Sequence, residues 1–252
     1  MDKYIITYSD AKEWTYIIDA IAVIVEEAGL VFRQDGMALR SLDPSRTAMV
    51  DLFIPKEGFE EYPELQSELR IGLNFKDFKK LLRRLKKGDK ISFEVEESKL
   101  RVKLIGKSTR SITLPYLETP AEELPTPKVV YTAMVKTASD VLDQAMKDAD
   151  AVADTVKFDV DEEALYIRAS SDRGEVEVKL DKGGELVYEF DVKEPASASF
   201  TLEYLVDITG KASKVSDIVT IELATAKPIS LTFDIPAGGK LAYYVAPHIE
   251  QA

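Results

Sequence analysis

The sequence predicts an α+β protein built from two similar domains. A helix followed by alternating strands recurs about every 65 residues, which is typical of an internal repeat. The segment YLETPAEELPTPKVVY, residues 116–131, separates two copies of this pattern and contains three prolines. Because proline lacks a backbone donor and favours an extended residue before it, this segment should connect two domains. We expect an N-terminal domain at 1–116, a connector at 117–130 and a C-terminal domain at 131–252.

The first half should contain two helices. Residues 10–28 are expected to form the first, because apolar side chains recur there at steps of three and four, and Gly29 should end it. The second is expected over residues 74–87, closed by Gly88. Alternating apolar residues predict strands at residues 30–34, 37–42, 47–55, 69–73, 90–96, 99–106 and 109–115.

The second half repeats this plan. Helices are expected over residues 138–149 and 202–211, again about 65 residues apart. The alternation of apolar and polar residues predicts strands at residues 129–136, 155–160, 164–170, 175–180, 186–192, 218–224, 229–236 and 240–247. The matching period on both sides of the connector favours a duplicated domain.

The residue types present argue against an enzyme. The chain has no cysteine and one histidine, His248, which excludes thiolate chemistry and leaves most catalytic triads and histidine metal sites out of reach. Gly238-Gly239-Lys240 lacks the upstream glycine and the Ser or Thr of a phosphate-binding loop, and a hairpin turn explains it better. We therefore expect a binding or structural protein without a cofactor or a metal ion.

The composition also indicates where the protein works. A hydrophobic content of 45% and a net charge of −12 are typical of a soluble globular protein. No apolar run approaches the roughly 18 residues that span a membrane, and the opening MDKYIITYSDAKEW lacks the layout of a signal peptide. We expect a cytoplasmic protein with no membrane partner.

The charge distribution gives a mixed prediction about nucleic acid. A net charge of −12 opposes phosphate binding overall. The segment FKDFKKLLRRLKK, however, gathers its apolar residues on one helical face and its basic residues on the opposite face, interrupted only by Asp77. An ordinary solvated surface and a phosphate-contacting face both fit this pattern.

Several longer stretches resemble one family. FRQDGMALRSLDPSRTAMVDLFIP at residues 32–55 and LAYYVAPHIE at residues 241–250 resemble the sliding DNA clamps of the proliferating-cell-nuclear-antigen family, particularly archaeal members. The similarity extends through GLNFKDFKKLLRRLKKGDKISF and SFTLEYLVDITGKAS. The resemblance implies the clamp fold and a ring of three subunits, with helices lining a central hole and sheets outside. Such a ring encircles duplex DNA as a processivity factor in the nucleoid.

The resemblance also implies three sets of site residues. The DNA-facing set is Lys80, Arg83, Arg84, Lys87, Lys147, Lys211 and Lys214. The set expected to border a hydrophobic groove for client peptides is Leu42, Arg46, Thr47, Met49, Leu124, Thr126, Pro127, Tyr131, Tyr244, Val245, Ala246 and Pro247. The subunit interface is expected at two edge strands and includes Lys107, Arg110, Ile112, Leu114, Glu175, Val176, Val178 and Leu180.

The implied partners are double-stranded DNA, other clamp subunits in a homo- or heterotrimer, and a clamp loader. DNA polymerase, flap nuclease and ligase would dock through short peptides with aromatic anchors. Thr47 and Thr126 replace the larger apolar residues common in the family, so client preference should differ.

Two other hypotheses remain open from the sequence. Thr15, Tyr16 and Ala22 stand where relatives often have lysines, which is compatible with a specialised peptide-docking subunit of a heteromeric clamp that contacts DNA little. The other is an enzyme that acts on a small acidic or sugar substrate through two close, buried carboxylates.

Overall fold

The computed structural model describes residues 3–83, 85–96, 99–115, 117 and 124–248. The chain forms two compact units. The first comprises residues 1–41, 50–124 and 235–241, and the second comprises residues 42–49, 125–234 and 242–252. Helices and antiparallel strands occur in both units, as the α+β prediction requires.

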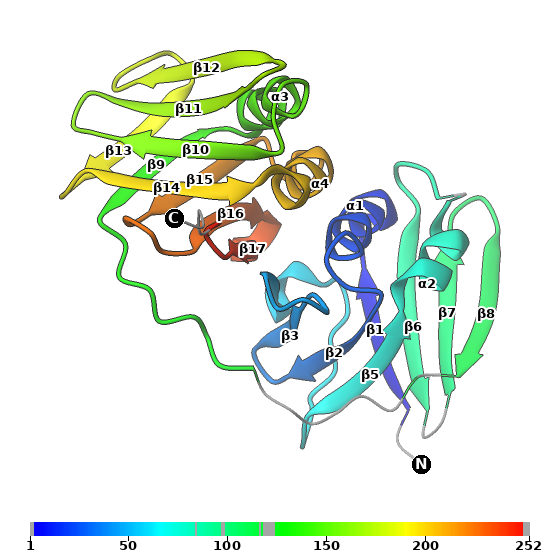
Figure 1. The fold of residues 1–252 in the computed structure, drawn as a ribbon. Coiled ribbons are helices and arrows are strands. Elements are labelled where there is room, and N and C mark those ends of the chain that lie inside the picture. The colour runs from blue at the N-terminus through cyan, green and yellow to red at the C-terminus, as the bar shows by residue number, and fades with distance from the viewer. Residues whose placement is uncertain (1–2, 84, 97–98, 116, 118–123, 249–252) are drawn as a thin grey trace. The chain divides into compact units, whose positions relative to one another are not determined.

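The N-terminal half alternates helices with short strands (Figure 1). Its elements are β1 (Tyr4–Tyr8), α1 (Ala11–Ile21), β2 (Glu27–Arg33), β3 (Gly36–Leu42), β4 (Ala48–Pro55), the 3-10 helix η1 (Lys56–Gly58), β5 (Leu69–Asn74), α2 (Phe75–Leu82), β6 (Lys90–Glu96), β7 (Lys99–Ile105) and β8 (Thr109–Pro115).

The C-terminal half has the same alternation. Its elements are β9 (Ala133–Ala138), α3 (Ser139–Asp150), β10 (Thr155–Val160), β11 (Ala164–Ser171), β12 (Gly174–Asp181), β13 (Val187–Val192), β14 (Ala196–Thr201), α4 (Leu202–Ala212), β15 (Ile218–Leu223), β16 (Ile229–Ile235), the 3-10 helix η2 (Pro236–Gly238) and β17 (Gly239–Val245). None of the helices in the described part of the chain has the length and apolar character of a membrane span.

The first two helices are shorter than the sequence predicts. Asp10 caps α1 as expected, but α1 ends at Ile21, and Gly29 lies inside β2 opposite Gly72 of β5. The helical spacing of apolar residues continued past the true end because the following turn and strand also bury apolar side chains. The second helix, α2, ends at Leu82, where Leu85 N donates to Leu82 O in a tighter turn. Arg83 and Lys87 therefore follow the helix instead of lying on it.

Two strands are missing from the sequence-based prediction, β1 and β14, and each precedes a helix. Both take part in an exchange between repeats. In the first unit β1 pairs with β6, which follows α2, while β5 pairs with β2, which follows α1. In the second unit β14 pairs with β10 and β9 pairs with β15 in the same way. Each repeat thus completes the sheet of its neighbour, so the two repeats of a unit should fold together.

The sheets follow from this exchange. In the first unit the strand orders are β1-β6-β7-β8 and β4-β3-β2-β5, and in the second unit they are β12-β11-β10-β14 and β13-β9-β15-β16. Within each unit, the two helices pack against each other, and α3 and α4 lie side by side in Figure 1.

Aromatic side chains join the helices to the sheets. The fully buried Trp14 of α1 lies with its ring 5.2 Å from Phe93 of β6 and 5.3 Å from Tyr8 of β1. Phe78 of α2 lies 6.2 Å from the same Phe93 ring. Each such side chain contributes about 1.5–3 kcal/mol through burial. One residue of β6 therefore anchors both helices of the first unit.

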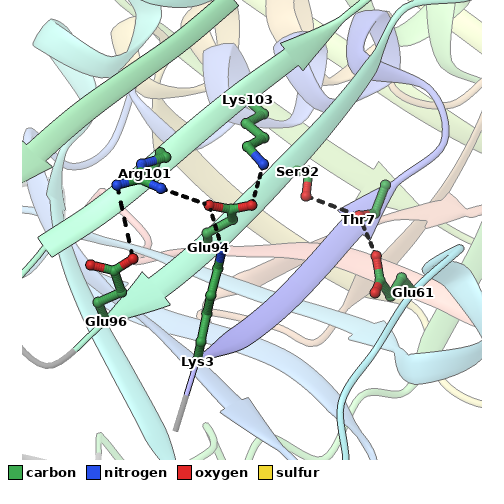
Figure 2. Close-up of polar contacts among 8 residues, drawn as sticks. All are labelled: Lys3, Thr7, Glu61, Ser92, Glu94, Glu96, Arg101 and Lys103. Carbon is green, nitrogen blue, oxygen red and sulfur yellow. Dashed lines mark hydrogen bonds and ion pairs between the residues drawn. The ribbon is translucent and has the colours of Figure 1, made fainter. Parts of the chain in front are cut away.

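A buried carboxylate holds three strands of the first unit together. Glu94 of β6 is 3% exposed and forms ion pairs with Lys3 (2.9 Å), Arg101 (3.3 Å) and Lys103 (Figure 2). The hydrogen bond from Lys103, opposed by burial and reinforced by Lys3, lowers the pKa of Glu94 from 4.5 to about 2. Because Lys3 precedes β1 and the other two cations lie on β7, the carboxylate links β1, β6 and β7.

We expect Glu94→Gln to lower the free energy of unfolding by about 2 kcal/mol at pH 7, because three cations lose their shared anion. The folded-state pKa lies below the unfolded one, so this stabilisation is complete above about pH 4.5 and is lost as the pH falls towards 2. Urea unfolding at a fixed protein concentration should show a difference from wild type that shrinks through this window. The control is Glu96→Gln, whose exposed carboxylate lies 3.9 Å from Arg101. Equal effects of both substitutions at pH 7 would contradict the assignment.

Candidate functional site

Basic side chains gather at the exposed face and the end of α2. Lys80 is exposed and forms an ion pair with Asp77 at 2.7 Å, while the opposite face buries Phe75, Phe78 and Leu82. Arg83 and Lys87 are exposed just after the helix. Arg84 lies outside the described residues. Because Lys80 already has a carboxylate partner, Arg83 and Lys87 offer phosphates the less neutralised charge.

The expected basic residues of the second unit lie on or beside its two helices. Lys147 of α3 is exposed and forms an ion pair with Asp143 at 2.6 Å. Thr209 of α4 donates to the other oxygen of Asp143 at 3.3 Å, which ties the two helices together. Lys211 of α4 is half-buried, and Lys214, in the turn after it, is exposed.

Several residues predicted to border a peptide groove do meet within the second unit. We call residues 42–49 the docking loop and residues 246–248 the tail. Ala246 N of the tail donates to Thr47 O of the loop at 2.8 Å. Tyr131 is half-buried, and burial, with the negative charge of Glu222, raises the pKa of its hydroxyl above the usual range.

The remaining residues predicted to border the groove differ in their exposure to solvent. Leu42 and Pro247 are half-buried, whereas Arg46 and Thr126 are exposed. Met49 is only 8% exposed and Val245 is completely buried, so Val245 presents no surface to a groove. Pro127 is half-buried in the second unit. Leu124 belongs to the first unit, where its carbonyl accepts a hydrogen bond from Arg40 at 3.0 Å.

Sequence reasoning missed two residues of the docking loop network, Asp43 and Tyr204. Asp43 is buried, and its carboxylate accepts backbone hydrogen bonds within the loop. Asp43-Pro44-Ser45 falls between the strands predicted at residues 37–42 and 47–55, and an aspartate that accepts a hydrogen bond from the second residue on is a common turn signal. Tyr204 lies on α4, and nothing in the local sequence joins it to Asp43.

The predicted interface residues lie on two sheet edges that remain open. Three other outer strands are partly covered: Thr7 of β1 pairs with Glu61, Gly72 of β5 pairs with Leu117, and Ser199 of β14 accepts from His248 N. The remaining outer strand, β13, pairs with β9 in an irregular register that shifts between Val187 and Glu189. In the part of the chain that the structure describes, no segment pairs with the outer edge of β8 or β12. Both strands keep an unbroken register with their inner neighbours. A long regular edge of this kind is a template for pairing with another chain.

Side chains along these two edges alternate in burial. On β8, Arg110, Ile112 and Leu114 are half-buried, and Lys107 is exposed in the preceding turn. On β12, Val176 and Val178 are half-buried, Leu180 is 9% exposed and Glu175 is exposed. The two edges thus combine apolar rows with charges of opposite sign. No group of three or more acidic or histidine side chains able to hold a metal ion occurs among the residues with a described position.

Comparisons with known proteins agree on one family. The family models for the proliferating cell nuclear antigen match its N-terminal domain at residues 7–116 and its C-terminal domain at residues 126–248. The chain is 72% identical over 250 residues to "DNA polymerase sliding clamp 1" of Pyrobaculum aerophilum, covering 99% of this chain and 100% of that protein. It is 44% identical over 244 residues to the sliding clamp of Thermofilum pendens, covering 96% of this chain and 98% of that protein.

Solved structures show the same fold. The clamp of Thermococcus kodakaraensis superposes with a TM-score of 0.91 at 25% identity, over 97% of this chain and 100% of that one. A chain of the PCNA2-PCNA3 complex from Sulfolobus tokodaii gives a TM-score of 0.89 at 28% identity, over 97% and 99% of the two chains. The two family models together span most of the sequence, so the chain belongs to the proliferating cell nuclear antigen family and has its two-domain clamp fold.

Proposed function

We propose that this protein, a DNA polymerase sliding clamp of its family, closes into a three-subunit ring that encircles duplex DNA. Clamps of this family are non-catalytic processivity factors, and the names of its relatives agree with that role. The single observation that carries the ring is the pair of open, regular edges, β8 and β12. A 28.1 kDa chain is too small to surround a duplex alone, whereas head-to-tail pairing of two different edges can close a ring.

Ring closure would join β8 of one subunit to β12 of the next. Backbone pairing would extend the sheet across the boundary, and Ile112 and Leu114 would meet Val176 and Val178. Lys107 and Arg110 near one edge would face Glu175 near the other. The same contacts would decide the composition of the ring. If β8 of one copy pairs well with β12 of another copy, the chain forms a homotrimer. If it does not, the chain needs different clamp proteins as partners.

DNA contact in such a ring should be weak and independent of sequence. Encirclement keeps the protein on DNA, so the inner surface needs only a few cations for phosphates, even on a chain with a net charge of −12. Arg83, Arg84 and Lys87 are the main candidates in the first unit. Lys80 and Lys147 would contribute less, because each already forms an ion pair with an acid. Lys211 and Lys214 are further candidates in the second unit.

Client proteins would dock through short peptides at the docking loop, the tail and the connector. The hydrogen bond from Ala246 of the tail to Thr47 of the docking loop supports a surface shared by these two segments. DNA polymerase, flap nuclease and ligase are the proposed clients, and a clamp loader would open the ring. The proposed division of the chain is an N-terminal domain at residues 1–116, a connector at 117–130 and a C-terminal domain at 131–252.

We expect the double substitution Arg83→Ala and Lys87→Ala to reduce loading onto nicked circular duplex about 5-fold and to make loading less sensitive to salt, since two phosphate contacts are lost. Loading assays over a salt series measure both effects. The matched control removes two exposed lysines away from the helices, Lys193→Ala with Lys227→Ala, and should behave as wild type. Loading by the double variant that equals wild type at every salt concentration would rule out this basic surface.

We expect Ile112→Asp to break ring closure, because a carboxylate would enter an apolar row between paired edges. Mass measurement over a concentration series should give three times the 28.1 kDa chain mass for a homotrimeric wild type and the chain mass for the variant. Val187→Asp on β13, another outer strand, is the control and should not change the mass. A trimer that survives Ile112→Asp would contradict the interface, and a wild type that stays monomeric alone would indicate a heteromeric ring.

A further inference from the structure

The docking loop is organised around one buried side chain. Asp43 is 6% exposed, and its Oδ1 atom accepts the backbone N–H groups of Thr47 and Ala48, both at 2.7 Å. Its Oδ2 atom accepts Ser45 N at 3.0 Å. Burial raises the pKa of Asp43, but hydrogen bonds from Ala48, Ser45 and Tyr204 outweigh it and leave the pKa below its usual value. The carboxylate is therefore charged at neutral pH, and its hydrogen bonds are the stronger, charge-assisted kind.

The loop needs this support because its backbone is strained. Arg46 has a φ of 60°, in the left-handed region that costs a non-glycine residue about 1 kcal/mol. Its N–H donates to Asp43 O at 3.0 Å, which closes the turn. Such a conformation persists only where surrounding contacts determine it. Loss of those contacts would let the loop relax into other conformations.

A side chain from α4 completes the network. Tyr204, in the first turn of α4, donates its hydroxyl to Asp43 Oδ2 at 3.0 Å and lies 2.9 Å from Ser45 Oγ. Ser45 Oγ also lies 2.8 Å from Thr47 Oγ1. All four residues belong to the second unit, although 161 positions separate Tyr204 from Asp43 in the sequence. The hydroxyl thus fixes the loop to a helix whose own position is set by packing on α3.

We propose that Tyr204 and Asp43 are positioning residues for client docking: they hold the docking loop in its peptide-receiving conformation without touching the peptide. This role rests on the proposed docking function and identifies the two residues that prepare the loop for binding. Half-buried Leu42 and Thr47 and the exposed Arg46 are presented from a loop whose shape the Asp43 carboxylate dictates. Tyr204 connects that shape to α4.

Positioning has a kinetic consequence that direct contact does not have. A loop that spends part of its time in other conformations lowers the fraction of competent molecules, so association slows in proportion while dissociation of the bound peptide is unchanged. A residue that touches the peptide acts mainly on dissociation. Measuring both the association rate constant and the dissociation rate constant therefore distinguishes a positioning role from direct contact with the peptide.

The test uses Tyr204→Phe, which removes only the hydroxyl, and Ser45→Ala, which removes the bridging oxygen. The probe is a fluorescein-labelled docking peptide from the flap nuclease of the same source, followed by stopped-flow anisotropy with the full chain. Both variants should associate about 5-fold more slowly than wild type, with dissociation unchanged. Tyr188→Phe is the matched control, because Tyr188 is half exposed on β13 and outside the network, and it should behave as wild type.

Faster dissociation with unchanged association would overturn the proposal in favour of direct contact, and unchanged rates for both variants would overturn it altogether. Thermal unfolding of each variant shows that it is folded under the assay conditions. If wild type itself failed to bind the peptide, the docking groove and this inference would both fall. If wild type binds the peptide and both variants bind it at the same rates, the docking groove would still be supported and only the positioning role would be rejected.

Discussion

Backbone pairing along strand edges is the constraint on which the rest of this structure depends. Within each unit, the strand that precedes one helix pairs with the strand that follows the other helix. These pairs are β1 with β6 and β5 with β2 in the first unit, and β14 with β10 and β9 with β15 in the second. Single contacts from Glu61, Leu117 and His248 then cover parts of three outer strands. The long edges of β8 and β12 stay open among the described residues, although an open regular edge invites association. Because these edges differ, the proposed pairing between copies would run head to tail, as a ring requires.

The buried carboxylates have different structural roles in the two units. Glu94 is buried on the sheet of the first unit, where its three cations join β1 to β6 and β7 and hold a strand that the local sequence hardly specifies. Asp43 is equally buried but accepts mainly from backbone, so it shapes a loop instead of joining strands. The exposed lysines of α2 and α3 are partly neutralised by acids three and four residues away. Such pairs contribute little to stability, and they weaken the attraction for phosphates, as the proposed sliding ring would require.

Sequence reasoning recovered most of this fold, and its errors have physical causes. Alternating strands and the amphipathic stripes of α2, α3 and α4 are local patterns and were predicted. The strand β1 was missed because YIITY lacks the alternation of apolar and polar residues on which the strand predictions rest, and β14 because ASASFT is small and polar. The stripe of α1 was extended too far, since Ile24 and Val25 are buried after the helix has ended. The Asp43–Tyr204 bond joins distant positions, so no window of the sequence could predict it. The groove, the interface and the DNA-facing residues came from family resemblance and remain proposals.

The measurement that tests ring closure most directly compares circular with linear DNA. The protein is loaded onto a nicked circular duplex, washed at high salt to remove phosphate-bound molecules, and treated with a restriction enzyme that cuts once. Encirclement predicts retention through the wash and release when the circle is cut, because only the topology of the DNA has changed. Loss of the protein in the wash, or equal retention on circular and linear DNA, would contradict a ring that holds DNA by enclosing it.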